Sequence, residues 1–123
     1  MRVYLCDFHA ENIRAAVRRA LADMPSPFEE GDAVAVKVHF GEKGNTRFVS
    51  AENVRIVAEK VPGRLFLTDA NTLYRGMRLN ATDHTKIAHD HGFGSIGLPI
   101  VIADGEQGDD EISVRIGKEI FDE

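Results

Sequence analysis

The sequence has a single cysteine, Cys6, and no long apolar run. One cysteine excludes an internal disulfide, and by itself it cannot hold an iron–sulfur cluster or a thiolate zinc site, because those need several thiolates. The longest apolar run, residues 98–103, contains Pro99 and is far too short to cross a bilayer. The chain also opens without the charged start and apolar centre of a signal peptide. These absences predict a protein of the reducing cytoplasm that makes no contact with membranes.

A surplus of positive charge is also missing. The chain has 15 basic and 20 acidic side chains and a net charge of −5, whereas nucleic-acid-binding domains usually carry a basic surplus. Its 123 residues suffice for one hydrophobic core, and shares of 43% hydrophobic and 28% charged residues are ordinary for a globular protein. We therefore expect a single domain over residues 1–123 that does not bind nucleic acid.

Short apolar segments alternate with helical patterns along the chain. Strands are predicted at residues 1–7, 33–38, 64–68 and 100–103, with residues 111–116 as an edge strand. Helices are predicted after the first three strands, with Ser50 and Asn80 as N-caps of the second and third. This alternation is typical of βαβ units with right-handed crossovers. The pattern predicts a three-layer α/β domain with a mainly parallel sheet of four to five strands and helices on both faces.

Two glycine-containing segments are similar in sequence to phosphate-binding motifs. Residues 92–97 (GFGSIG) match the spelling of the dinucleotide fingerprint, but that motif needs a strand before it and a helix after it. Here a helix precedes and a strand follows, so we reject a dinucleotide site. Residues 41–46 (GEKGNT) do follow a predicted strand and precede a helix. Their backbone amides could form an anion-binding nest, and a plain surface loop is the alternative.

Polar side chains follow the predicted strands at their carboxyl ends, where parallel sheets bind ligands. Lys37 lies in a strand otherwise rich in valine and alanine, so it needs a partner, and Asp69 is the natural one if the two strands are adjacent. Basic residues, Arg78 among them, gather in or beside the two central loops and predict a local anion site. The candidate ligand-binding residues are Lys37, His39, Lys43, Asn45, Thr46, Arg47, Asp69, Asn71, Thr72 and Arg75.

The histidines do not predict a metal site. His84 and His91 share one helical stripe but lie about 10 Å apart along a helix, too far to bind one ion. The i, i+4 pair of zinc-binding helices is missing. We expect histidines of the inner face to form hydrogen bonds with their neighbours, with His84 as the exception to consider because it follows Asp83 near the helix start.

Three segments carry a resemblance to a known family: residues 35–54 (AVKVHFGEKGNTRFVSAENV), 66–93 (FLTDANTLYRGMRLNATDHTKIAHDHGF) and 97–105 (GLPIVIADG). Together they resemble the family called domain of unknown function 362, whose members are often described as iron–sulfur-centre proteins. The resemblance spans most of residues 1–117. It implies that this chain corresponds to the N-terminal part of a longer architecture, and that a cluster belongs to longer relatives only, with no cofactor in this chain.

The sequence is compatible with three functions. The first is binding of a small ligand, most simply an anion, by a domain of a redox-associated protein. The second is a metal- or histidine-dependent enzyme in which His39 is a general base oriented by Asp69, with Lys37 as a further catalytic candidate. The third is a scaffold for a missing C-terminal iron–sulfur segment. The partners expected are an anionic small molecule and, for a homo-oligomer, a second copy.

Overall fold

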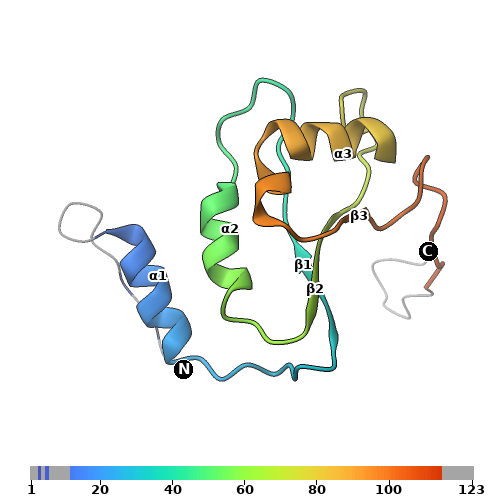
Figure 1. The fold of residues 1–123 in the computed structure, drawn as a ribbon. Coiled ribbons are helices and arrows are strands. Elements are labelled where there is room, and N and C mark those ends of the chain that lie inside the picture. The colour runs from blue at the N-terminus through green and yellow to red at the C-terminus, as the bar shows by residue number, and fades with distance from the viewer. Residues whose placement is uncertain (1–2, 4, 6–11, 115–123) are drawn as a thin grey trace, which may run out of the picture.

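The computed structural model describes Val3, Leu5 and residues 12–114 (Figure 1). Helices and strands alternate in the order α1 Ile13–Ala22, β1 Ala33–Lys37, α2 Ala51–Ala58, β2 Arg64–Asp69, α3 Ala81–Asp90, the short 3-10 helix η1 Phe93–Ile96 and β3 Ile100–Ile102. The three strands form one parallel sheet in the order β1-β2-β3. The predicted α/β class and its parallel sheet are therefore confirmed. No helix in this part of the chain is long and apolar enough to cross a membrane.

The boundaries of α2 and α3 follow from local side-chain chemistry. Ser50 accepts a hydrogen bond from the Asn53 amide, and Asn80 accepts one from the Asp83 amide, so both predicted N-caps are confirmed. After α3, Gly92 adopts a φ of 88°, in the left-handed region that favours glycine. The glycines of residues 92–97 thus stand between a helix and a strand. That order confirms that the fingerprint spelling is not a dinucleotide motif.

Both crossover helices pack on the same face of the sheet. Val54 of α2 and Ala88 of α3 share one buried cluster with Leu67 of β2. Because both connections step in the same direction along the sheet, right-handed crossovers place both helices on one side. The remaining buried members of this cluster are Val38, Phe40, Phe93 and Ile102.

The described residues form three strands and two layers, fewer than the four to five strands and three layers expected. The predicted strand at residues 1–7 lies outside the described residues, apart from Val3 and Leu5. Residues 111–114 form no strand, and the last two residues of that predicted edge strand lie outside the described part. Ile112 and Val114 are 90% and 74% exposed, so their alternating apolar pattern has no core to cover there.

Candidate functional site

Asp69 lies at the carboxyl end of β2 and is 5% exposed. Its Oδ1 is 2.8 Å from Lys37 Nζ, and its Oδ2 is 3.2 Å from an Arg78 guanidinium nitrogen and 3.5 Å from His84 Nε2. Lys37 ends β1, and Lys37 pairs in register with Thr68 of β2, which places it beside Asp69. The predicted pairing of Lys37 with Asp69 is therefore confirmed, and it depends on the adjacency of β1 and β2.

A second acid, Glu42, joins the loop after β1 to the loop after β2. Glu42 Oε1 accepts hydrogen bonds from the amides of Met77 (2.8 Å) and Lys43 (3.2 Å). Its Oε2 lies 3.6 Å from Nε of Arg78, which is 5% exposed. A Cβ on Gly76 would meet Glu42 Oε2 at 2.6 Å, so glycine leaves room for this contact. We call Lys37, Glu42, Asp69, Arg78 and His84 the ion cluster.

Glu42 was not among the sequence-predicted site residues, although residues 41–46, which contain it, were considered as an anion-binding loop. In the structure, the Glu42 carboxylate accepts a hydrogen bond from the backbone amide of Lys43. Lys43 belongs to residues 41–46, the loop considered as an anion-binding nest. The protein's own carboxylate therefore uses at least one of the donors that an external anion would need.

The surroundings of both acids keep them ionised. Burial raises the pKa of the Asp69 carboxyl, but the contact with His84, the hydrogen bond from Lys37 and the Ala70 amide outweigh burial and hold that pKa well below its usual range. Burial also raises the pKa of Glu42, and the amides of Met77 and Lys43 together with Arg78 reverse the effect and lower it. The ion cluster thus brings two carboxylates together with a lysine and an arginine around a buried histidine.

The histidine that contacts Asp69 is His84, not His39. His84 is fully buried, and its ring meets the ring of Phe40 edge-on at a centroid distance of 5.7 Å. His39 is exposed, and its Nδ1 accepts a hydrogen bond from the Gly41 amide at 3.0 Å. The geometry therefore brings Lys37 and Asp69 together and engages His39 with its own loop. A sequence signal for His84 existed in its position on the inner stripe of α3.

The other predicted ligand-binding residues divide into two groups. Asn71 and Thr72 stabilise the loop after β2. The backbone amide of Asn71 donates a hydrogen bond to Asp104, and the Asn71 side-chain Nδ2 donates one to the Gly105 carbonyl. Thr72 Oγ1 lies 3.3 Å from the Arg78 carbonyl oxygen. The other group lies in the loops nearer to solvent. It consists of Lys43, Asn45, Thr46, Arg47 and Arg75, of which Asn45 is partly buried and accepts a hydrogen bond from the Arg47 amide at 2.8 Å.

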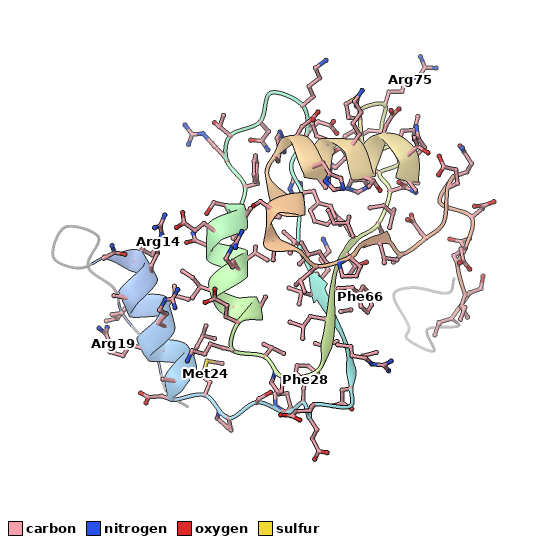
Figure 2. All side chains as sticks on the ribbon, in the orientation of Figure 1. Arg14, Arg19, Met24, Phe28, Phe66 and Arg75 are labelled. Carbon is pink, nitrogen blue, oxygen red and sulfur yellow. The ribbon has the colours of Figure 1, made fainter. Side chains whose placement is uncertain are left out.

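The basic side chains Lys43, Arg47 and Arg75 are exposed, and none takes part in an ion pair within residues 12–114. On α1 the situation differs for two arginines, because Arg14 pairs with Glu52 and Arg18 lies 3.4 Å from Glu59. In Figure 2, Arg75 points away from the body of the molecule. The cations of the two loops are thus exposed and without ion pairs among the described residues.

A groove of about 400 Å³ lies beside β1, and Lys37 and His39 line part of it. Its other walls come from α1, α2 and the chain before α2. The remaining lining residues are Val17, Val36, Val38, Val49, Asn53, Val54 and Val57. The groove is mainly apolar, in contrast to the two charged loops.

Parallel strands connected by helices, with an ion cluster at the carboxyl edge of the sheet, define an α/β domain, a class in which ligands generally bind at the strand-end loops. Residues 34–123 match the family described as Domain of unknown function (DUF362). The chain belongs to this family, as the resemblance in its central loops implied. No curated protein and no solved structure matches the chain.

Proposed function

We propose that this domain binds a small anionic ligand on the two loops that follow β1 and β2. The observation that carries the proposal is that three exposed cations without ion pairs among the described residues gather in these two loops. Arg14 and Arg18 on α1 have acid partners, whereas the exposed loop cations Lys43, Arg47 and Arg75 have none among the described residues. A protein of net charge −5 that leaves cations unpaired in its loops offers a local positive field.

The ion cluster supports this proposal by joining the two loops. Lys43 directly follows Glu42, and Arg75 precedes Met77 by two residues, so the Glu42–Met77 hydrogen bond of 2.8 Å ties the two cations to one surface. A fixed arrangement of the two loops lowers the backbone entropy that the loops would lose on binding a ligand. Lys37, whose side chain is 66% exposed while it contacts Asp69, gives the cluster a cation open to solvent.

Phosphate is the probe for the experiment, with thermal unfolding as the readout at constant ionic strength. A ligand specific for the native state stabilises it by about 2.7 kcal/mol at a hundredfold excess over its dissociation constant, which raises the thermal midpoint by several degrees. The test variant is Lys43→Ala/Arg47→Ala. The matched control is Arg14→Ala/Arg18→Ala, which removes the same charge from α1, where both arginines are paired.

We expect phosphate to stabilise the wild type and the α1 control equally, and the loop variant much less. Ions such as phosphate and sulfate also stabilise proteins by exclusion from their surface, and that effect is common to all three proteins. Equal stabilisation of all three would therefore contradict an anion site on these loops.

The setting of this binding is part of the proposal. One cysteine suits a reducing, cytoplasmic compartment. The family resemblance suggests a role beside iron–sulfur proteins, in which this domain itself carries no cofactor and a cluster belongs to longer relatives. Iron and sulfide analysis of a longer relative tests that association, and absence of both elements from it would contradict the association.

A further inference from the structure

The β1 side of the sheet has an open edge within the described residues. The Val38 amide donates to the Thr68 carbonyl at 2.9 Å, and the Arg64 amide donates to the Asp32 carbonyl at 2.7 Å. Backbone groups alternate in direction along a strand, so the even-numbered residues of β1 bond to β2. The backbone N–H and C=O groups of Ala33, Ala35 and Lys37 therefore point away from β2, where no described strand pairs with them.

The position of α1 matches that of a crossover helix leading into β1. Arg14 pairs with Glu52 and Arg18 with Glu59, so α1 lies beside α2 and runs in the same direction. Figure 1 shows both helices running opposite to β1. In the rest of the chain each such helix follows a strand, α2 following β1 and α3 following β2. By the same right-handed rule, a strand preceding α1 belongs beside β1 at its open edge.

The valine-lined groove gives this edge an apolar side. Val17 of α1, Val36 of β1 and Val57 of α2 all line its volume of about 400 Å³. Meanwhile Val3 and Leu5, which alternate in sequence, are 70% and 87% exposed. An uncovered apolar groove and exposed apolar side chains in one chain are complementary surfaces.

We propose that the open edge of β1 is the docking site of the chain's own N-terminal segment, residues 1–7, as a fourth parallel strand. Val3 and Leu5 share one face of an extended strand and enter the groove, whereas Cys6 falls on the opposite face, beside Ala33 and Ala35. This interaction is separate from the proposed anion site, which lies on the loops after β1 and β2.

The observations favour this occupant over a second copy of the chain. Residues 1–7 are joined to α1 by a few residues, which gives them a high effective concentration at the edge. A second copy related by a two-fold axis would instead place its β1 antiparallel to this one, and α1 would then connect to no strand in the sheet.

Disulfide trapping with the natural Cys6 tests the proposal in the full chain. Neighbouring strands lie about 4.8 Å apart, within the Cα separation that a disulfide needs. The test variants are Ala33→Cys and Ala35→Cys, which cover two registers on the face expected for Cys6. The matched control is Val101→Cys, which is 44% exposed but lies on β3, at the other edge of the sheet. A Cys6→Ser/Ala35→Cys double variant shows whether the bond uses Cys6.

At low protein concentration under mild oxidation, we expect most of the Ala33→Cys or Ala35→Cys protein to form an intramolecular disulfide, identified by mass spectrometry. The Val101→Cys and Cys6→Ser/Ala35→Cys proteins should form none. Absence of the bond from both β1 variants, or equal yield from Val101→Cys, would overturn the proposal. Disulfide-linked dimers in place of the intramolecular bond would assign the edge to a second copy and would equally overturn it.

Discussion

Replacement of Asp69 by asparagine removes one negative charge from the ion cluster while it keeps the size of the side chain and an oxygen acceptor. In the variant, the Arg78 guanidinium is still buried, at 5% exposure, and its remaining acid contact among the described residues is Glu42 at 3.6 Å. Removal of one partner of a buried ion pair costs about 3–5 kcal/mol, because the other charge stays desolvated. We expect a loss of about 3 kcal/mol, at the lower end, because Glu42 still offers Arg78 a carboxylate and Lys37 is free to turn to solvent.

Urea-induced unfolding measures this loss. With a denaturant dependence of about 1–3 kcal/mol per molar, a loss of about 3 kcal/mol lowers the unfolding midpoint by about 1–3 M. Such a loss is a large part of the total stability of a domain, which is typically about 5–15 kcal/mol. The matched control is Glu52→Gln, which also removes one carboxylate charge from an ion pair, but from the exposed pair with Arg14. Exposed pairs contribute about 0–1 kcal/mol, so its midpoint should stay near that of the wild type.

The comparison separates burial from charge alone. If Asp69→Asn and Glu52→Gln lower the midpoint equally at an unchanged denaturant dependence, the buried cluster does not stabilise the fold more than a surface pair does. The reasoning about Asp69 and Arg78 would then be wrong.

Three further predictions concern the same chain. The folded protein holds the pKa of Asp69 below its unfolded value of about 3.9, so the ionised carboxylate stabilises the fold fully well above that pH and loses this effect as the pH falls toward the folded-state pKa. In urea unfolding, the stability difference between wild type and Asp69→Asn should therefore shrink progressively below about pH 5, and a difference that stays constant would contradict this prediction. Gly76→Ala should push Glu42 away from the Met77 amide and lower the free energy of unfolding by about 1 kcal/mol. Gly31→Ala, where a Cβ meets nothing within 4 Å, should leave the free energy of unfolding almost unchanged, and similar losses in both variants would contradict a role for Gly76 in this contact. The purified 123-residue chain should contain no iron–sulfur cluster, because Cys6 supplies one thiolate; iron and sulfide analysis with a visible spectrum checks this, and one cluster per chain would refute it.

The sequence predicted those features that depend on neighbouring residues or on a repeated pattern. The parallel sheet followed from alternating apolar segments and helical stripes, and both N-caps from Ser50 and Asn80. The ion pair between Lys37 and Asp69 could be predicted because a charged residue inside an apolar strand needs a partner, and adjacent strands bring their carboxyl ends together. These inferences required only the period of the pattern and the order of the elements.

Contacts between loops could not be predicted in the same way. The sequence places Arg78 among the basic residues of the central loops, but in the structure Arg78 is buried between Asp69 and Glu42. Nothing in the sequence distinguishes Glu42 from a solvent-exposed acid, because the Met77 amide that donates a hydrogen bond to it lies 35 residues away in the sequence. Such contacts depend on how two loops of irregular backbone fold over the sheet edge, which no periodicity encodes. The number of strands was overestimated at residues 111–114 because alternation alone does not guarantee a neighbouring strand.

The place of Glu42 has a consequence for the ligand that the loops could accept. Glycine loops that bind phosphate do so through backbone amides that point at the anion. Here the Lys43 amide donates to Glu42, whose carboxylate is also held by the Met77 amide and faces Arg78. An incoming anion would therefore meet the flexible side chains of Lys43, Arg47 and Arg75 before it met any of these donors. Recognition through long cationic side chains favours the charge of a ligand over its detailed shape, and its strength falls as ionic strength rises. We therefore expect the proposed site to bind anions as a class, with little preference for a single phosphate geometry.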